Sequence, residues 1–527
     1  MKKGFTLIEL LAVIIILAII ALIATPIILN VVEDARISAG KSETQMIYSG
    51  INSYCASSMM EEQLNGKDDI CADGVTTEEV STMVNLGNAI VNKVTYNNGK
   101  VTELEVESNN HTFRLCGDGS FVMDDEECGV APDVPEEDYT DNSGANAPEL
   151  DTNMIPIKYD GSNWVYADTS ESWYNYDNKE WANAVVLNDG VNKNVGETIT
   201  EDEIALWYVW IPRYKYQLFN ADNGSVAAQL INIEFERGTA STGTVSCTDA
   251  IATSGSSSET CTNASNGNWY THPAFTFGEE EITGFWIGKF EVSGSTDTIT
   301  VKPNVSSLRS TSVSEYFTAI QNMKTTYGLS GDSHMIKNME WGAVAYLKQS
   351  KYGLGETDIG INNNSSYTTG CGATAGSSSS STCEAYNTTN GMLASTTGNI
   401  YGVYDMSGGA WEYVMGNMVN SSGAFYANSS GFSSAPDTKY YDAYTYGTSN
   451  TDHVRGKLGD ATKETLATFG SNTGGWYSDY AHFVSSSNSW FYRGGDHSHG
   501  SDAGVVSFIN GNGGGGGGCS SRTVLVP

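Results

Sequence analysis

The N-terminus contains a long apolar stretch. Within residues 5–29 the only charged side chain is Glu9, and Lys2 and Lys3 come just before this stretch. As a helix rising about 1.5 Å per residue, it would span the hydrocarbon core of a bilayer. It is too long for the apolar part of a secretory signal and has no small-x-small cleavage site. We therefore expect a membrane segment in which the carboxylate of Glu9 marks a function.

The opening KKGFTLIELL resembles the leader of type IV prepilins and pseudopilins. In that family a membrane peptidase cuts after the glycine, here Gly4, and methylates the new N-terminus, here Phe5. Glu9 matches the acidic residue that pairs with the terminal amine of a neighbouring subunit, and Pro26 matches a helix-kinking proline. The resemblance implies that the membrane, the prepilin peptidase and other pilin subunits are partners. It also implies a path from the cell membrane to an extracellular pilus or the cell surface; a plain membrane anchor is the alternative.

Composition divides the chain into five segments. Apolar residues keep a helical spacing beyond the membrane segment, and strand-like runs such as KVTELEVES follow between turn signals. An acidic, proline-containing stretch with few large apolar side chains then predicts a linker. The predicted segments are a leader at 1–4, a pilin helix at 5–58, a pilin head at 59–130, a linker at 131–154 and a large domain at 155–527.

The large domain contains three phrases, NMEWGAVAYL, NIYGVYDMSGGAWEYV and WFYRGG, and ends with RTVLV. Their order and chemistry resemble the C-type-lectin-like domain of the formylglycine-generating-enzyme type, although Ser520 and Ser521 replace the usual Gly-Phe before the last strand. The resemblance implies an α+β fold for the whole chain: a pilin helix with a small β head, then this domain. It assigns structural roles in the core to Glu340, Trp341, Asp405, Trp411, Trp490, Arg493, Gly494, Gly495 and Arg522.

The chemistry of that family does not carry over. Its oxidases hold copper with a cysteine pair near the RGG segment, and here RGGDHSHGSDAGVVSF contains no cysteine. His497 and His499 lack a third ligand, so they make a weak metal site. The seven histidines contain no HxxxH spacing, and the motifs of calcium-dependent lectins do not occur. We expect no enzyme activity, cofactor or metal; an anchored metalloenzyme of the formylglycine-generating type and a structural major pilin are the alternatives.

Charge and cysteine spacing point outside the cytoplasm. With a net charge of −35, the chain has few basic side chains to spare for neutralising phosphates, which argues against nucleic acid as a partner. Eight of the nine cysteines fall in near pairs, and each pair would close a loop worth about 3 kcal/mol if oxidised. None has CxxC spacing, so disulfides are the better interpretation. The candidates are Cys55 with Cys71, Cys116 with Cys128, Cys247 with Cys261, and Cys371 with Cys383, and Cys519 is left over.

The C-terminus has an unusual composition. Glu, Lys, Gln, Met and Trp make up about one residue in six of the chain, yet residues 496–527 contain none. These are the five amino acids that no codon ending in C or T encodes. Asn codons (AAC) mutated at their adenines give the residues seen here, including glycine from GGC. The tail therefore resembles the variable region, here 488–527, of proteins diversified by a retroelement; a flexible glycine-rich terminus is the alternative.

This resemblance predicts a hypervariable face that binds an unknown protein or surface ligand. A fixed scaffold would hold the face, so its residues could be substituted at little cost in stability. The predicted binding residues are Asp496, His497, Ser498, His499, Asp502, Ile509, Asn510, Asn512, Gly513, Gly514, Gly515, Gly516, Gly517, Gly518 and Cys519.

Overall fold

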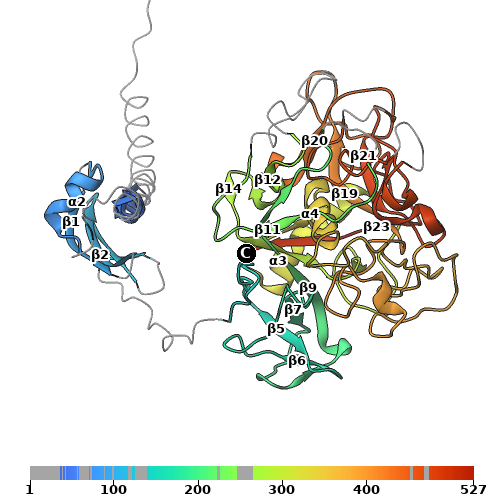
Figure 1. The fold of residues 1–527 in the computed structure, drawn as a ribbon, viewed down its shortest axis with the longest axis horizontal. Helices are drawn as coiled ribbons and strands as arrows, with labels where there is room; N and C mark the ends of the chain where they lie inside the picture. Colours follow the sequence, from blue (N-terminus) through green and yellow to red (C-terminus); the bar gives the residue numbers. More distant parts are fainter. Residues whose placement is uncertain are drawn as a thin grey trace, which may run out of the picture. The chain divides into compact units, whose positions relative to one another are not determined.

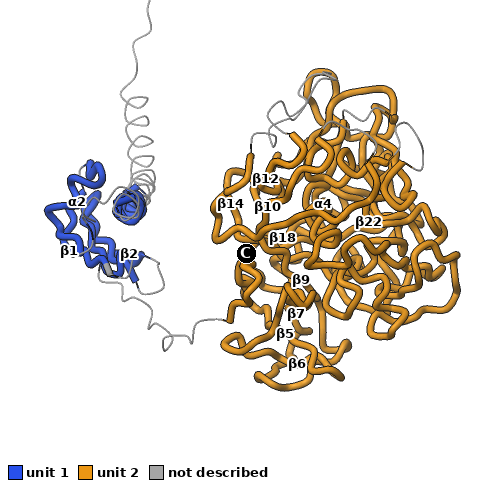
Figure 2. The backbone as a smooth tube through the Cα atoms, viewed as in Figure 1, with its two compact units in different colours: residues 1–135 blue, residues 136–527 orange. Residues whose placement is uncertain are grey.

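The computed structural model describes residues 36–58 without 38, 42 and 56, then 71, 74–87, 89–97, 100–116, 121–124, 139–221, 226–245, 265–451, 455–467 and 474–527. The chain forms two compact units, 1–135 and 136–527, which Figure 2 colours separately. The predicted leader, the membrane segment 5–29 and Gly4, Phe5 and Glu9 lie outside the described residues. Within the described residues, no helix has the length and apolar character needed to cross a membrane.

The first unit is a helix beside a small antiparallel sheet. The described residues of 36–58 are helical, and Ile47, Ile51 and Cys55 bury one face of the helix at the expected spacing. A disulfide joins Cys55 to Cys71. The short helix α2 (Thr77–Met83) precedes four strands in the order β1 (Ile90–Asn97), β2 (Lys100–Ser108), β3 (His111–Leu115) and β4 (Phe121–Met123) (Figure 1).

The second unit is β-rich with few helices, and its largest sheet has eight strands. In spatial order these are β18 (Asp332–Met335), β24 (Thr523–Val526), β15 (Gly284–Gly288), β9 (Ile204–Pro212), β7 (Asn183–Leu187), β5 (Met154–Tyr159), β6 (Trp164–Tyr166) and β8 (Thr198–Ile199). The apolar run IALWYVWIP makes β9 buried at every position. The last strand of the chain, β24, lies between β18 and β15 and is buried at every position.

A second sheet carries the candidate residues. Its strands run in the order β20 (Asp442–Tyr444), β19 (Trp411–Met418), β21 (Trp490–Gly494) and β22 (Gly504–Gly511), and β23 (Cys519–Ser521) pairs in parallel with β19. Smaller sheets are formed by β10 (Tyr214–Gln217), β11 (Ile233–Phe235) and β12 (Trp269–Thr271), by β13 (Thr276–Phe277) and β14 (Glu280–Glu281), and by β16 (Ser293–Gly294) and β17 (Ile299–Thr300). Short 3₁₀ turns occupy Glu201–Glu203, Pro273–Phe275, Gly391–Ala394, Thr438–Tyr440, Trp476–Ser478 and Gly500–Asp502.

Two longer helices pack in this unit where the sequence pattern predicts them. Helix α3 (Val313–Tyr327) starts at a capping box of Ser312 and Glu315 and ends at Gly328, whose φ is 63°. Helix α4 (Asn338–Lys348) is buried on all sides. The segments SVSEYFTAIQNMKTTYG and NMEWGAVAYLKQSKYG have a helical pattern in the sequence, and the two helices lie within them.

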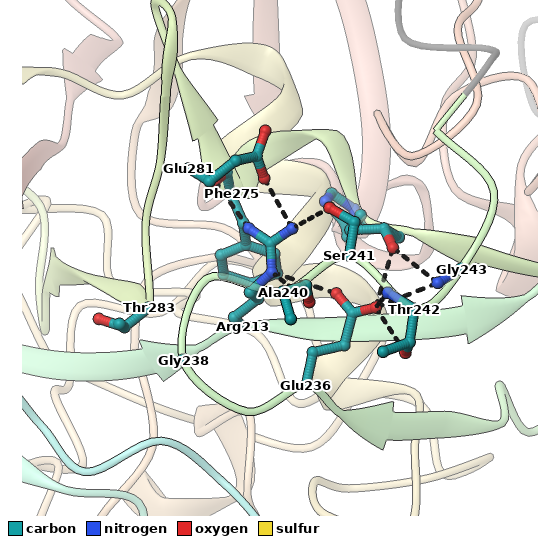
Figure 3. A network of polar contacts seen from close by, with 12 residues as sticks. Arg213, Glu236, Gly238, Ala240, Ser241, Thr242, Gly243, Phe275, Glu281 and Thr283 are labelled. Carbon is teal, nitrogen blue, oxygen red and sulfur yellow. Dashed lines mark hydrogen bonds and ion pairs between the residues drawn. The ribbon is translucent and has the colours of Figure 1, made fainter. Parts of the chain in front are cut away.

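A buried arginine, Arg213, binds several segments of this unit through polar contacts (Figure 3). Arg213 directly follows β9, and its side chain is fully buried. Its guanidinium lies 3.2 Å from a carboxylate oxygen of Glu236 and 2.6 Å from one of Glu281, and donates to the Ser241 hydroxyl. The other oxygen of Glu236 accepts from the main-chain N–H of Thr242. Such pairing offsets the cost of removing these charges from water.

The disulfide predictions are confirmed where the structure describes both cysteines. Cys371 is bonded to Cys383, with Cα atoms 5.1 Å apart, as Cys55 is to Cys71. Cys128, Cys247 and Cys261 lie outside the described residues, so the two pairings that need them stay predictions. Among the described cysteines, Cys519 is free.

Candidate ligand-binding face

The predicted binding residues lie mainly on two connections of the second sheet. Residues 495–503 join β21 to β22, and residues 512–518 join β22 to β23. Across the sheet, Tyr413 is opposite Tyr492, and Tyr492 is opposite Ile509, so these three side chains share a face. The half-buried Ile509 therefore lies beside fixed aromatic residues.

Asn510 does not share that face. It is opposite Phe491 in the register, and its side-chain amide donates to the carbonyl oxygen of Phe483 at 2.7 Å. Successive side chains of a strand point to opposite sides of the sheet. Asn510 therefore lies on the other side of the sheet from Ile509, with its side chain directed toward a neighbouring loop.

The glycine-rich connection is held by its main-chain carbonyl groups. Almost every carbonyl oxygen of 512–518 accepts a hydrogen bond from a residue outside the connection. The bonds are Ser429 N to Asn512 O (2.9 Å), Val313 N to Gly513 O (3.0 Å), Tyr413 Oη to Gly514 O (2.9 Å), Ser310 N to Gly516 O (3.0 Å), the Arg309 guanidinium to Gly517 O, and Trp411 N to Gly518 O (2.9 Å). A main-chain carbonyl is present whatever the side chain, so this attachment does not depend on residue type.

Two of the six glycines are nevertheless required. Gly513 has φ +85°, and a Cβ there would lie 2.6 Å from Ser430 Cβ and 2.7 Å from the Trp490 ring. A Cβ on Gly515 would lie 2.6 Å from the carbonyl oxygen of Ser310. The expectation that the whole run tolerates substitution is therefore wrong at these two positions, because main chain or a buried ring occupies the space.

The other four glycines have room for side chains. A Cβ on Gly517 would meet nothing within 4 Å, and one on Gly514 or Gly518 would have no neighbour closer than 3.3 Å. On Gly516 the nearest atom, at 2.7 Å, is the Sγ of Cys519, the end of a side chain that is itself a candidate variable residue. Side chains at these positions would extend from the connection.

The first connection contains a self-contained polar cluster. One carboxylate oxygen of Asp496 accepts from the main chain and hydroxyl of Ser498 and lies 2.7 Å from His499 Nδ1. Burial alone would raise the pKa of Asp496, but the bonds from His499 and Ser498 lower it to about 2. The bond to Asp496 raises the pKa of His499. Asp502, in the turn that follows, is half-buried.

Fixed residues from distant parts of the chain border this face. The His497 ring lies edge-on to Tyr367, 4.6 Å between centroids, and its Nδ1 is 2.9 Å from the Ser379 hydroxyl. The Arg309 guanidinium lies 4.0 Å from the centre of the Tyr367 ring. No sequence pattern marks Tyr367, Arg309 or Ser379 as neighbours of the face, because they belong to loops far away in the chain.

The two histidines have separate neighbours. The ring of His499 packs against Trp411 at 4.9 Å, whereas His497 contacts Tyr367. In the part of the chain that the structure describes, no group of three His, Cys, Asp or Glu residues is placed to hold a metal ion. The free Cys519 is half-buried beside Trp411 in the register, and burial raises the pKa of its thiol.

The side chain of Arg522 contacts both large sheets, through Glu412 of β19 and the carbonyl oxygen of Gly288 of β15. Its side chain is fully buried; Nε is 3.0 Å from Glu412, and a second nitrogen pairs with the other carboxylate oxygen. It also donates to the carbonyl oxygens of Gly288 and Tyr404, both at 2.8 Å. Nearby, the carboxylate of Asp405 accepts from Asn362, and burial raises the pKa of Asp405. These contacts fix the direction in which the chain leaves β23.

The remaining predicted core residues lie on β21 of the same sheet, directly after it, or on helix α4. Trp341 donates from Nε1 to the carbonyl oxygen of Val505 at 2.8 Å, and Arg493 donates to the carbonyl oxygen of Ala461 at 3.0 Å. Glu340 pairs with His334 at 3.0 Å. Gly494 and Gly495 have φ of +86° and +80°, and a Cβ on Gly495 would lie 2.7 Å from that of Ala503. Trp490 is fully buried.

Comparison with known proteins adds information at the N-terminus. The chain carries a prokaryotic N-terminal methylation motif at residues 1–25. A search of curated proteins gave no match.

Among solved structures, three variants of a protein titled Major Tropism Determinant are similar. The M1 variant is 12% identical over 81% of this chain and 81% of that chain, with a TM-score of 0.24. The P3c variant is 13% identical over 81% and 82%, and the U1 variant 12% over 81% and 81%, each with a TM-score of 0.23. At these TM-scores the similarity identifies neither the domain type nor a ligand.

Proposed function

We propose that this protein is a pilus-associated ligand-binding protein of the cell surface, an adhesin or receptor, with a face diversified by a retroelement. The observation that carries the proposal is the attachment of residues 512–518 through their carbonyl groups. Because the scaffold contacts the main chain, side chains at Gly514, Gly517 and Gly518 can change while the connection keeps its path. Loops held in this way on a rigid sheet are suited to binding.

The composition of the tail supports diversification as the source of the face. Residues 496–527 lack the five amino acids that codons ending in C or T cannot encode. Structure alone does not demand that absence, since Ser498, Asn512 and Gly517 are exposed and could hold a lysine or glutamate. A mutated set of AAC codons accounts for both the absence and the glycines. In this proposal the domain is C-type-lectin-like, of the formylglycine-generating-enzyme type.

The methylation motif supports display outside the cell. In this proposal the prepilin peptidase cuts after Gly4, the segment 5–29 anchors the chain in the membrane, and Glu9 mediates entry into a pilus of other pilin subunits. The acidic stretch before the second unit then separates the binding domain from the pilus. A structural major pilin would not need a second unit of this size.

We further propose that the face binds without catalysis. Its two histidines are occupied by Ser379 and by Asp496, and the buried acids beneath it are held by Arg522, Asn362 and main-chain groups. An anchored metalloenzyme of the formylglycine-generating type remains the competing proposal, and copper or iron binding by the purified chain would favour it.

Exchange of side chains on the face tests the function. In the full chain, Ser498, Asn512, Gly514 and Gly517 are replaced together by Tyr, Asp or Ser, and the chains are compared for binding to a panel of bacterial and host surface proteins. We expect the preferred partner to change while the unfolding midpoint stays the same. A matched control replaces four exposed residues of the second unit remote from the face, Asp160, Asn178, Asp189 and Asp297, and should leave the partner unchanged. If the face variants and the control share one partner, the proposal is wrong.

A further inference from the structure

The glycine connection exposes hydrogen-bond donors without acceptors. The carbonyl oxygens of Gly516, Gly517 and Gly518 accept bonds from the scaffold or from Cys519. By contrast, the main-chain N–H groups of residues 515–518 donate to no atom of the residues that the structure describes. Gly515 and Gly517 are exposed, and no side chain in the run covers these N–H groups. The main chain here can therefore donate four hydrogen bonds to a ligand, whereas most of its carbonyl oxygens already accept a bond from the scaffold.

The shape of the connection gathers these donors. Cys519 N donates to Gly516 O at 3.1 Å, which closes a turn with Gly517 and Gly518 at its centre. Neither central residue has a positive φ, which excludes the turn types that need one. In a turn of the remaining kind, the N–H groups of the central residues point away from the closing bond. Successive N–H groups in a turn form concavities that bind anions.

A cation lies beside this turn. The Arg309 guanidinium donates to Gly517 O and stacks on the Tyr367 ring, so its position is fixed from two sides. An arginine in a fixed position is the side chain best suited to bind carboxylate or sulfate. The donor row and the guanidinium come from segments about two hundred residues apart in sequence, and they meet only in the folded chain.

One acidic side chain near the turn, that of Asp496, would repel a bound anion. Asp496 lies near Gly518, with a carboxylate oxygen 3.8 Å from the position a Cβ would take. Its other oxygen is occupied by Ser498 and His499. The guanidinium of Arg309, which contacts the turn directly, carries the opposite charge.

We propose that this form of the face binds an oxyanion, a carboxylate or sulfate group of its partner, through the N–H groups of residues 515–518 and the guanidinium of Arg309. The inference rests on the proposed function and gives the chemistry of the ligand for this variant. A row of N–H donors beside a guanidinium is complementary to a negatively charged group that accepts hydrogen bonds. Carboxylate and sulfate differ in geometry, and the probes below separate them.

Two substitutions of one glycine isolate the main-chain donor. Gly517→Pro removes the N–H, and proline fits the second position of this kind of turn. Gly517→Ala keeps the N–H and adds a Cβ in a place with nothing within 4 Å. Radiolabelled sulfate and acetate are titrated against the full chain by equilibrium dialysis at constant ionic strength, and thermal unfolding shows that each variant is folded.

We expect saturable binding of one of the two probes to the natural chain and to Gly517→Ala. Gly517→Pro should weaken it about tenfold, the equivalent of one charge-assisted hydrogen bond. Arg309→Gln, which keeps every main-chain donor, is the second variant and should weaken binding by a similar factor. Asp496→Asn should strengthen it. Equal binding by the Pro and Ala variants, or no saturable binding of either probe, would overturn the proposal. A partner that changes with the exchanged side chains would still leave the proposed function in place.

Discussion

The hydroxyl group of Tyr413 donates a hydrogen bond to the carbonyl oxygen of Gly514, 2.9 Å away. Tyr413 is a buried residue of the central strand β19, and Gly514 is a candidate variable position. The bond connects the constant part of the domain to the connection without contacting its side chain. Trp411 and Gly518 are related in the same way through main-chain atoms. The connection is thereby attached through main-chain atoms, and its side-chain positions take no part in the attachment.

Glycine positions should differ in their tolerance. Gly517→Ser should change the free energy of unfolding by no more than about 0.5 kcal/mol, because the new side chain enters open space. Gly513→Ser should cost at least about 2 kcal/mol, because it combines a positive φ with overlap against Ser430 and Trp490. Urea unfolding of the two variants measures both values. Equal costs would show that the connection adapts as a whole and that Gly513 is not required.

Loss of the buried arginine should be costly. Arg522→Met leaves Glu412 buried without its partner, and breaking such a pair costs about 3–5 kcal/mol. The double variant Arg522→Met, Glu412→Gln removes the stranded charge and should recover part of this loss. A double-mutant cycle from denaturant unfolding gives the coupling. If the double variant loses as much free energy of unfolding as the two single variants added together, the two side chains do not interact directly.

Stability should fall as pH rises from about 4.5 to 7. Burial raises the pKa of Glu464 from 4.5 to about 7, against hydrogen bonds from Tyr346, Gly459 and Tyr216 that lower it. The folded protein therefore binds this proton more tightly than the unfolded chain within that window, and its stability declines as the proton is lost. Glu464→Gln should make the unfolding free energy less dependent on pH between 5 and 8. An unchanged slope would show that Glu464 is ionised throughout.

Processing at the N-terminus follows from the methylation motif. The exported protein should begin at Phe5, and Gly4→Val should leave an uncut precursor. Glu9→Val should still be cut but should enter filaments poorly, because the terminal amine of a neighbouring subunit loses its partner. N-terminal sequencing and filament fractionation measure the two steps. An exported protein that begins at Met1 would contradict the pilin interpretation.

Local patterns predicted several elements of the second unit. The apolar runs LWYVWIP and GFWIG form β9 and β15, and the helical spacing around Phe317 and Trp341 forms α3 and α4. These succeeded because the periodicity of apolar residues directly reflects which side of an element is buried. The pairing of Cys371 with Cys383 followed from their short separation.

The support of the face could not be predicted in the same way. Ser310, Val313 and Ser429 hold the connection through main-chain N–H groups, which every residue except proline possesses. No side-chain pattern therefore marks these residues. The requirement for glycine at 513 is also not predictable from the sequence, since a run of six identical residues does not show which two positions the fold restricts to glycine.

The DNA next to the coding sequence tests the central claim most directly. If a retroelement diversifies this face, sequencing should find a reverse transcriptase gene and a near-copy of the last coding segment. In that near-copy the codons for Gly514, Gly516, Gly517 and Gly518 should be AAC. The codons for Gly513 and Gly515 should already encode glycine, because the fold admits nothing else there. The absence of a near-copy, or AAC-derived variation that extends to the codons of Trp490 and Arg522, would contradict the account.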